Sequence, residues 1–368
     1  MRVLHVSGAK GWGGNEQQMV DLIPELSKLG VGNFVFGIEN SLLHNECLNR
    51  KISFISSKND KLNTLLNYRY LKTIVKEIKP DLIHLHTSDS LTVFTISDLL
   101  FGLKTKTVFS KKGMGTSSSF LSKLKYNYKG IDSIICVSNS VQRDLGIMLN
   151  NISKSKTMVI HDCVSLDILN VKANINLRET FDIPYNFKII GNIANHTNAK
   201  DLPTFLNVVD YVINELKNTD IKFVQIGEFT ESTSELKQIV KNKKLDQYIF
   251  FTDKIKSASS VLNQFDLFLL TSQREGGPTS VLEAMLQGIP VISTEVGLIP
   301  EVIQNGENGF FTPIKSVALL AEKIVLLLSN EKLQKQFSAF NIEKVKEQFL
   351  APYIARETFT EYLRILKL

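Results

Sequence analysis

The sequence predicts an α/β protein with two doubly wound domains that face each other across a cleft. Short apolar segments alternate with helical patterns along the chain, and this alternation stops at a polar stretch, residues 165–186, and then begins again. The 368 residues are also too many for one ordinary core. Strands that alternate with helices form parallel sheets with right-handed crossovers. We therefore expect ligands to bind where the carboxyl ends of the strands open onto the cleft.

The predicted strands are short and mostly continuous in apolar character, which is typical of strands buried on both faces. The first series is 2–8, 34–38, 52–57, 81–86, 107–111, 133–138 and 156–161, and the second is 187–193, 221–227, 248–253, 267–272, 290–295 and 309–312. Helical patterns fill most gaps, such as residues 14–30, which end at Gly30, and residues 68–79, which stop before Pro80. The helical segment after residue 331 is too long for one more crossover.

The composition is that of a soluble globular protein, with 43% hydrophobic and 22% charged residues. No stretch reaches the roughly 18 apolar residues of a membrane span, and the start of the chain predicts a strand rather than a signal peptide. Cys47, Cys136 and Cys163 lie far apart without metal or redox spacing. We expect them to be buried thiols in a reducing compartment, and the protein to be cytoplasmic.

The positive charge of the chain is concentrated in its first half. Residues 1–185 hold 23 Lys and Arg against 16 Asp and Glu, whereas residues 186–368 hold 20 against 21. The segment Lys104–Lys129 carries seven lysines and no acidic residue. It is either a solvated surface or a region attracted to an anionic membrane surface or a phosphorylated acceptor. We expect no nucleic-acid partner, because the segment contains no recognisable binding motif.

A glycine-rich loop, GAKGWGGNEQQ at residues 8–18, follows the first strand and opens the first helix. Glycines let backbone amides approach a ligand closely, and a helix N-terminus favours an anion. The spacing of Gly8, Gly11, Gly13 and Gly14 does not match the dinucleotide fingerprint, which argues against a nicotinamide dehydrogenase. Either a phosphate contact or a plain tight turn is compatible with this loop.

Two histidines, His84 and His86, end the predicted strand 81–86 and share one face of it. A zinc site would need further ligands, and the sequence shows no His, Cys or Asp cluster that supplies them. We therefore expect no metal site. His86 lies nearer the cleft and is the better candidate for a polar contact, whereas a structural role is expected for His84.

The segment SQREGGPTSVLEAMLQG, residues 272–288, combines a turn with a helix start near Thr279. Exposed N–H groups at this start would hold a diphosphate. Glu275 precedes the helix and can reach a sugar hydroxyl, and Glu283 lies one turn inside with its Cβ tilted back toward the same end. The alternative is a surface glutamate and a capping glutamate. An unpaired carboxylate among apolar neighbours is costly, which favours a function for Glu283, such as holding two ribose hydroxyls.

These residues carry a resemblance to a known family. The element Glu275-x7-Glu283, followed by AMLQGIPVISTEVGLIPEVIQNGENGFF, resembles the signature of family-four retaining glycosyltransferases, whose GT-B fold has two Rossmann-like domains. GGNEQQMVDLIPELSKLG, PDLIHLH, IICVSNSV and GNIANHTNAKDLPTF resemble further family segments. The resemblance implies an acceptor-binding domain at 1–166, a nucleotide-sugar-binding domain at 167–350, and a return helix at 351–368 that packs on the N-terminal domain.

The resemblance also implies the roles of individual residues. The implied catalytic residues are His86, Lys200 and Glu275, with Lys200 neutralising the leaving diphosphate. The implied donor-binding residues are Gly14, Asn195, Lys200, Glu275, Gly276, Gly277, Pro278, Thr279, Ser280 and Glu283, and the acceptor-binding residues are Gly13, His86, Lys111 and Lys112. The chain contains no DxD sequence, which agrees with a reaction that needs neither metal nor cofactor.

The sequence departs from the family pattern at two places. Asn195 stands where the family has an arginine for the phosphates, so His196, Lys200 and the helix amides must suffice or another basic residue must move in. Residues Asp162 to Ser165 replace the family's Asn-Gly-Val-Asp, and we carry no role over to them.

The resemblance predicts a retaining hexosyltransferase or N-acetylhexosaminyltransferase. We expect it to move a sugar from a nucleoside diphosphate sugar, with uridine as the expected base, to a glycan or lipid-linked acceptor in cell-envelope polysaccharide synthesis. It would act in the cytoplasm, with the inner face of the membrane as a candidate surface through Lys104–Lys129. The alternatives are a non-catalytic partner subunit, which Asn195 favours, and a sugar-nucleotide epimerase of the same fold.

Overall fold

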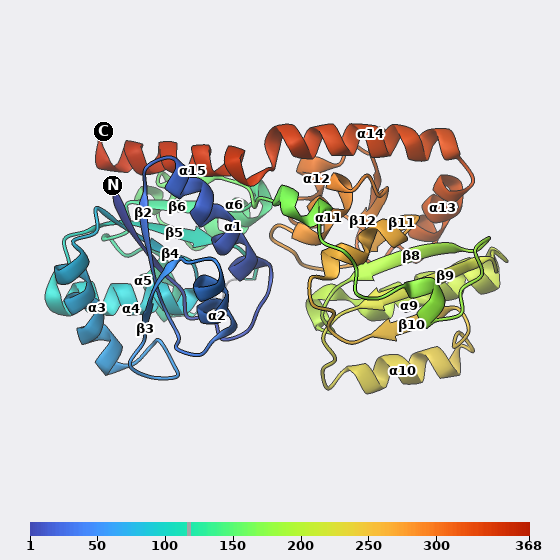
Figure 1. The fold of residues 1–368 in the computed structure, drawn as a ribbon, viewed down its shortest axis with the longest axis horizontal. Helices are drawn as coiled ribbons and strands as arrows, with labels where there is room; N and C mark the ends of the chain where they lie inside the picture. Colours follow the sequence, from blue (N-terminus) through green and yellow to red (C-terminus); the bar gives the residue numbers. More distant parts are fainter. Residues whose placement is uncertain (116–118) are drawn as a thin grey trace. The chain divides into compact units, whose positions relative to one another are not determined.

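The computed structural model describes residues 1–115 and 119–368. The chain forms two compact units, and Figure 1 shows that each is built from a sheet flanked by helices. The N-terminal unit contains Met1–Val164 and Phe349–Leu368, and the C-terminal unit contains Ser165–Gln348. The boundaries expected from the sequence, at residues 166 and 350, lie close to these divisions at 164 and 348.

A parallel sheet forms the centre of the N-terminal unit, with the order β3-β2-β1-β4-β5-β6-β7 in the described residues. Its strands are β1 (Arg2–Val6), β2 (Gly32–Gly37), β3 (Ser53–Ser56), β4 (Leu82–Leu85), β5 (Lys106–Lys111), β6 (Ser133–Cys136) and β7 (Thr157–Val159). Every predicted strand of the first series is present. The parallel arrangement expected from the alternation of strands and helices is confirmed.

The helices of this unit are α1 (Gly14–Lys28), α2 (Leu42–Asn49), α3 (Leu65–Ile78), α4 (Ser88–Phe101), α5 (Phe120–Tyr126), α6 (Asn139–Gly146), α7 (Asn151–Lys154) and α15 (Ala351–Leu366). Most are short crossovers that begin at a polar cap. Thr87, for example, caps α4, because its side chain accepts from the Ser90 backbone N–H. The Ser90 side chain in turn accepts from the Thr87 backbone N–H.

The last helix, α15, belongs to the N-terminal unit, as predicted for a return helix. It lies alongside α1 (Figure 1). Its apolar face joins the core next to the sheet, with Tyr362 fully buried there. The chain just before α15 is tied to the end of the first half, because Val164 N–H donates to the Phe349 carbonyl at 2.8 Å and Ala351 N–H donates to the Val164 carbonyl at 3.0 Å.

The C-terminal unit repeats the design with the sheet order β10-β9-β8-β11-β12-β13 in the described residues. Its strands are β8 (Lys188–Ile193), β9 (Ile221–Ile226), β10 (Ile249–Thr252), β11 (Leu267–Leu270), β12 (Val291–Thr294) and β13 (Phe310–Thr312). Its helices are η1 (Leu166–Leu169), α8 (Leu177–Thr180), η2 (Asn198–Lys200), α9 (Leu202–Asp210), η3 (Tyr211–Glu215), α10 (Thr233–Asn242), η4 (Ala258–Gln264), α11 (Thr279–Leu286), α12 (Ile299–Val302), α13 (Val317–Leu328) and α14 (Glu331–Gln348).

The polar stretch 165–186 contains no strand, as expected, but it is anchored to the C-terminal unit. Leu177 is fully buried, and its N–H donates to the Gln264 side chain at 2.8 Å. This stretch therefore packs on the C-terminal unit and is not a free linker.

The order of strands locates where each sheet can bind a ligand. The chain reverses its direction of growth between β1 and β4 in the N-terminal unit and between β8 and β11 in the C-terminal unit. Crossover helices then leave on opposite faces, so the loops at the carboxyl edge separate and open a crevice. These two switch points are the places to look for a functional site.

Two predictions about chemistry outside the sites can be checked. The three cysteines are unpaired and buried, as predicted, and burial raises the pKa of Cys47 and of Cys136 to about 12. In the described part of the chain, no helix combines the length and the apolar character that crossing a membrane requires.

Candidate functional site

Two loops meet at the carboxyl edge of the C-terminal sheet, one after β8 and one after β11. The two strands are neighbours, with Leu267 opposite Ile190. The loops are joined through backbone contacts, because the Gln273 N–H donates to the Ala199 carbonyl at 2.9 Å. The switch point therefore brings together chain segments more than 70 residues apart, and both carry residues predicted from the sequence.

The central contact of this site joins Lys200 to Glu275. Lys200 Nζ donates to Glu275 Oε1 at 2.6 Å, and Ser272 Oγ donates to the same oxygen at 2.7 Å. The side chains of Lys200 and Glu275 are 28% and 10% exposed. Glu275 Oε1 is thus held by two donors, whereas Oε2 has no hydrogen-bond partner among the described residues. The structure brings together two of the three residues predicted to be catalytic.

Helix α11 begins directly after this pair. Thr279 is its first residue, as predicted, and Pro278 precedes it without a side-chain cap. The backbone N–H groups of Gly276, Gly277, Thr279 and Ser280 have no acceptor in the part of the chain that the structure describes. Unpaired N–H groups at the positive end of a helix dipole form a site for an anion.

The turn before α11 is supported by a second loop that packs against its backbone. Gly297 has a φ of +53°, and a Cβ atom there would lie 2.5 Å from the Gly276 carbonyl oxygen and 2.7 Å from that of Glu275. A larger residue would displace this backbone, and its φ would also be unfavourable. Gly297 thereby helps to hold Glu275 and Gly276 in place.

Glu283 lies half-buried in α11, one turn from its start, between buried apolar neighbours. The argument that its carboxylate lacks a partner is wrong, because Glu283 has an interaction within the protein. Its assignment to a ribose therefore depends on its position near the start of α11 and on the resemblance alone.

Asn195 and His196 follow β8, and both are engaged within the C-terminal unit. Asn195 is exposed, and its Oδ1 accepts from the Glu228 N–H at 3.1 Å. His196 is buried, with Nδ1 bonded to Thr233 Oγ1 at 2.8 Å and Nε2 to Gln225 Oε1 at 2.7 Å. Burial lowers the pKa of His196. The idea that His196 supplies the charge missing at Asn195 is therefore wrong.

The switch point of the N-terminal unit carries the glycine-rich loop and His86. Gly13 precedes α1, and Gly14 is its first residue. The Glu16 carboxylate folds back toward this helix start, where Asn15 Nδ2 donates to Oε1 at 3.2 Å and the backbone of Gly13 is a further partner. Burial raises the pKa of Glu16. An acidic side chain already lies where a phosphate bound by Gly14 would sit, and so the geometry gives that contact no support.

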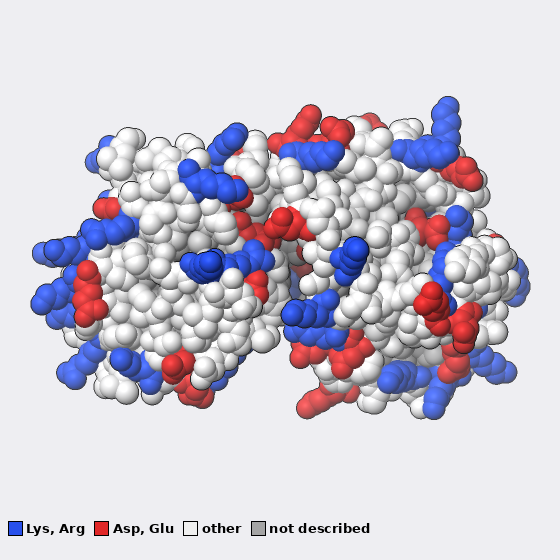
Figure 2. All heavy atoms as spheres, in the orientation of Figure 1, with Lys and Arg blue, Asp and Glu red and all other residues white. Residues whose placement is uncertain are grey.

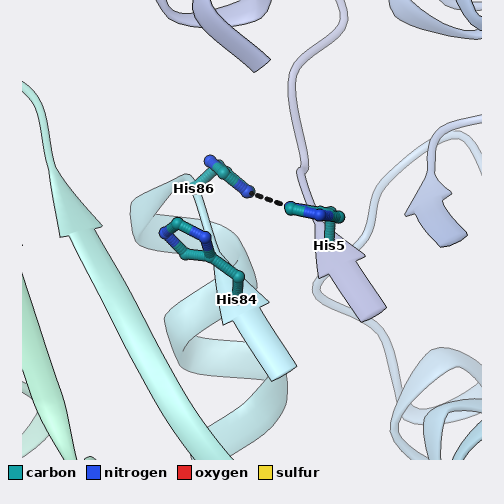
Figure 3. A group of neighbouring side chains, drawn as sticks. All are labelled: His5, His84 and His86. Atoms are coloured by element: carbon teal, nitrogen blue, oxygen red, sulfur yellow. Dashed lines mark hydrogen bonds between the residues drawn. The ribbon is translucent and has the colours of Figure 1, made fainter. Parts of the chain in front are cut away.

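Three buried histidines gather on one side of the N-terminal sheet (Figure 3). His84 and His86 share a face, as predicted, with ring centroids 4.1 Å apart, and His5 of β1 lies beside them. His5 Nδ1 is 2.9 Å from His86 Nε2. His84 has a structural environment, since its ring nitrogens contact Tyr362 Oη at 2.6 Å and Ser110 Oγ at 2.7 Å.

The expectation that no further ligand lies near His84 and His86 is wrong, because His5 completes a group whose nitrogen atoms lie within 4.8 Å of one another. These contacts do not amount to a prepared metal site. In the described residues, five of the six ring nitrogens already have hydrogen-bond partners.

The two lysines predicted to bind an acceptor are both engaged. Lys112 forms an ion pair with the buried carboxylate of Asp162, and Lys111 Nζ donates to the Gly113 carbonyl. Burial raises the pKa of Asp162 despite the nearby ammonium group. Lys112 therefore balances a buried charge within the N-terminal unit, which explains its place in the fold without an acceptor.

Each unit contains a cavity lined by its own described residues. One of about 650 Å³ is lined by residues such as Asn176, Arg178, Phe265 and Asp266. Asp266 precedes β11, so this cavity lies at the opposite edge of the sheet from Lys200 and Glu275, and we assign no donor to it. The other, about 20 Å³, is lined by residues that include His84, His86 and Lys112, and it has room for about one water molecule.

The sequence argument missed three residues that lie in or next to the segments forming these sites. Arg274 precedes Glu275 in the chain, and its side chain is exposed and has no partner in the described residues. Its position inside the Glu275 motif could have identified it. His5 and Asn33 lie on adjacent strands and contact each other at 2.9 Å. Only the pairing of β1 with β2 and β4 reveals them, since neither belongs to a sequence motif.

Models of known families match both halves of the chain. The model described as Glycosyltransferase Family 4 matches residues 12–168, and that described as Glycosyl transferases group 1 matches residues 186–330. The first match begins inside the glycine-rich loop, and the second contains Lys200, Glu275 and Glu283.

Two curated proteins with similar sequences have names that refer to N-acetylglucosaminyl groups. N-acetyl-alpha-D-glucosaminyl L-malate synthase of Bacillus anthracis is 25% identical over 78% of this chain and 75% of its own length. Poly(ribitol-phosphate) alpha-N-acetylglucosaminyltransferase of Staphylococcus aureus is 24% identical over 54% of this chain, and the match spans only 40% of that protein.

Solved structures share the fold. A glycosyltransferase of Rickettsia africae has a TM-score of 0.84 at 21% identity, covering 100% of this chain and 98% of that one. HepE of Anabaena, crystallised with UDP and glucose, has a TM-score of 0.83 at 17% identity, covering 98% and 99%. With the two family models matched in sequence order, this chain is a family-four-type glycosyltransferase with the GT-B fold.

Proposed function

We propose that this glycosyltransferase transfers a sugar from a uridine diphosphate sugar to a glycan or lipid-linked acceptor of the cell envelope, with retention of the anomeric configuration. One observation carries the proposal: Lys200, Glu275 and four unpaired backbone N–H groups meet at the switch point of the C-terminal sheet. A cation, a carboxylate and a helix N-terminus together suit a phosphate joined to a sugar.

The names of similar proteins support the donor and the biological setting. HepE was crystallised with UDP-glucose, and two curated relatives are named as N-acetylglucosaminyl enzymes. Relatives are also named for poly(ribitol-phosphate) and for O-antigen biosynthesis, both of which concern envelope polymers. We therefore propose a hexosyl or N-acetylhexosaminyl donor and an envelope acceptor for this chain.

In the proposed reaction the bond between the anomeric carbon and the diphosphate oxygen breaks while the acceptor oxygen bonds to the same face, and the proton of the acceptor hydroxyl passes to the departing diphosphate oxygen. Negative charge grows on the leaving diphosphate, and oriented donors that face it lower the barrier. The N–H groups of Gly276, Gly277, Thr279 and Ser280 can supply such donors. Lys200 Nζ has three donor positions and uses one on Glu275, and so two remain for the phosphates. This mechanism requires no metal ion.

Glu275 and Arg274 complete the proposed donor site. Glu275 Oε1 is occupied by Lys200 and Ser272, so Oε2 would accept from a donor-sugar hydroxyl. Because the Glu275 carboxylate offsets the charge of Lys200, the leaving group needs another cation. We propose that the exposed side chain of Arg274 supplies the charge that Asn195 lacks.

For the acceptor we propose His86, at the carboxyl end of β4 in the N-terminal unit. The residue is 5% exposed, and burial holds the pKa of its imidazole well below the ordinary value, so the ring is neutral at physiological pH. A neutral imidazole can accept a hydrogen bond from a hydroxyl. Asn195, which is engaged with Glu228, remains the observation that favours the alternative of a non-catalytic partner subunit.

Thermal unfolding of the purified protein with a panel of nucleoside diphosphates and their sugars tests the proposal. We expect uridine diphosphate to raise the unfolding temperature and one of its sugars to change that rise, because a ligand stabilises the state that binds it. Slow release of free sugar from the stabilising donor should accompany binding. Stabilisation without any hydrolysis or transfer would favour the partner-subunit alternative, and no stabilisation by any nucleotide would contradict the proposal.

Lys200→Ala should reduce kcat by about 100-fold and change donor affinity much less, because its ammonium group faces charge that grows in the transition state. The measurement is steady-state donor hydrolysis or transfer. Lys188→Ala is a matched control. It removes a lysine that pairs with Asp266 at 3.0 Å at the amino edge of β8 and β11, whereas Lys200 lies at the carboxyl edge of these strands. An unchanged kcat in Lys200→Ala, or an equal loss in the control, would remove the leaving-group role.

Glu283→Ala should weaken binding of uridine diphosphate by about tenfold or more, the effect of losing hydrogen bonds to a charged group. Isothermal titration with the ribonucleotide and with its 2′-deoxy form separates the ribose contact from general damage. The substitution should cost less affinity for the deoxy form. Equal losses for both nucleotides would rule out the contact, and Glu235→Ala, in the first turn of α10, controls for surface charge.

We also propose that the N-terminal unit associates with an anionic membrane surface. Figure 2 shows Lys and Arg side chains, with acidic side chains between them, along the edge of this unit where α3 and α4 lie in Figure 1. In the short helix α5, Phe120, Leu121 and Leu124 are 74%, 75% and 54% exposed beside Lys123. Residues 116–118 of the lysine-rich segment lie outside the described residues. Exposed apolar side chains with adjacent lysines suit an anionic lipid surface.

Replacing Phe120 and Leu121 by serine should lower binding to phosphatidylglycerol vesicles by about tenfold, because apolar area no longer enters the interface. Co-sedimentation measures this, and added salt should weaken binding of the unchanged protein. The control replaces Ile147 and Ile152, which are 83% and 72% exposed in the same unit. Equal binding by all three proteins would contradict this surface.

A further inference from the structure

The three histidines of the N-terminal unit lie in a chain of hydrogen bonds whose direction can be worked out. Asn33 starts this chain. Its Nδ2 donates to the Val31 carbonyl and to Ser27 Oγ, both at 3.0 Å, and lies 3.4 Å from the Ile23 carbonyl. Carbonyl oxygens only accept hydrogen bonds, so the amide nitrogen must face them. Asn33 Oδ1 is therefore the atom that faces His5.

The orientation of Asn33 sets the tautomer of His5. Asn33 Oδ1 is 2.9 Å from His5 Nε2, and an amide oxygen can only accept. His5 Nε2 must carry the proton. Burial lowers the pKa of His5 to about 4, so the ring is neutral at physiological pH and its Nδ1 has a lone pair. His5 Nδ1 is then an acceptor.

The same reasoning extends to His86. His5 Nδ1 lies 2.9 Å from His86 Nε2 (Figure 3). Because His5 Nδ1 accepts, His86 Nε2 must carry the proton and donate. His86 is buried and neutral, and one proton is all that a neutral imidazole carries. Its Nδ1 therefore has a lone pair and no proton.

His86 Nδ1 is also the ring nitrogen that remains available. Of the six ring nitrogens in the cluster, it alone has no hydrogen-bond partner in the described residues. In the described residues, the side-chain atoms that are both buried and without a partner are Asn15 Oδ1, Thr95 Oγ1 and Asn341 Nδ2. His86 Nδ1 is not one of them, so it is not a fully buried atom. In Figure 3 the second nitrogen of His86 points away from His5.

We propose that Asn33 and His5 are positioning residues that hold His86 in the Nε2–H tautomer, so that His86 Nδ1 accepts a hydrogen bond from a hydroxyl of the substrate. The ligand chemistry follows from the lone pair. A sugar or acceptor hydroxyl can donate to it, whereas a phosphate or carbonyl oxygen cannot bind there. The catalytic consequence depends on the proposed glycosyl transfer, but the tautomer itself does not.

Nitrogen-15 NMR of histidine-labelled full-length protein at about pH 8 tests the tautomer without any ligand. Each of the six histidines is assigned by its own substitution. We expect His86 with a protonated Nε2 and an unprotonated Nδ1, and His5 with the same pattern. A His86 ring protonated at Nδ1 would overturn the proposal, as would a metal ion that co-purifies and shifts all three cluster histidines when it is removed.

Two substitutions at Asn33 separate the tautomer from the stability of the fold. Asn33→Leu and Asn33→Asp both remove the donors to Val31 and Ile23, so both should lower stability. Only aspartate keeps an acceptor for His5 Nε2. Asn33→Leu leaves that N–H buried without an acceptor, which favours moving both protons so that His5 Nδ1 donates to His86. We expect His86 to shift toward the Nδ1–H form in Asn33→Leu and to keep the Nε2–H form in Asn33→Asp.

Activity distinguishes a positioning role from a structural one. With the donor found in the panel, Asn33→Leu should lower kcat by about tenfold or more with little change in donor KM, and Asn33→Asp should restore most of it. An unaltered His86 tautomer in Asn33→Leu would overturn the relay. If the tautomer shifts as predicted but kcat does not, the hydroxyl contact of His86 is wrong. If no variant or parent transfers sugar, the proposed function fails while the tautomer result stands.

Discussion

The architecture of both sites depends on one constraint, which is that each parallel sheet reverses its strand order at a single place. At the β8–β11 boundary this places Lys200 next to Glu275 although they are far apart in the chain. At the β1–β4 boundary it places His5 beside His84 and His86. The helices and loops around them, including α11, Gly297 and α15, keep these groups in position. The reversal makes β1 the neighbour of β4 and β8 the neighbour of β11, and this adjacency brings these residues together.

The two candidate sites differ in their electrostatics. In the proposed function the C-terminal site receives a dianionic diphosphate. It combines an ammonium group with backbone N–H groups at the start of α11 that have no acceptor in the described residues. The site also contains the Glu275 carboxylate, which offsets the charge of Lys200. This is why we propose that Arg274 supplies further positive charge. The N-terminal cluster is instead neutral, because burial lowers the pKa values of its imidazoles so that each ring carries a single proton, and hydrogen bonds determine which nitrogen holds it. A neutral, oriented acceptor suits a hydroxyl, whereas a cationic site suits a phosphate.

Much of the fold followed from sequence pattern, since strands buried on both faces are apolar throughout and the gaps between them carry helical periodicity. The start of α11 at Thr279 was predictable from the turn Gly276-Gly277-Pro278 that precedes it. Contacts between distant loops were not predictable, because they depend on strand order. His5 and Asn33 carry no motif, and only their places on β1 and β2 make them neighbours of His86. The sequence also does not reveal whether a basic side chain is free to bind a ligand. His196 and Lys112 are basic residues, but both are bound to other side chains within the fold.

The central claim is that a nucleoside diphosphate binds at the β8–β11 switch point, with its phosphates at the start of α11. The most direct measurement is titration of uridine diphosphate into nitrogen-15-labelled protein, followed through the backbone amides. The account predicts the largest and saturable shifts at Gly276, Gly277, Thr279 and Ser280, whose N–H groups have no acceptor among residues 1–115 and 119–368. Shifts confined to the amino edge of this sheet, around Asp266 and Asn176, or to the glycine-rich loop before α1, would contradict it.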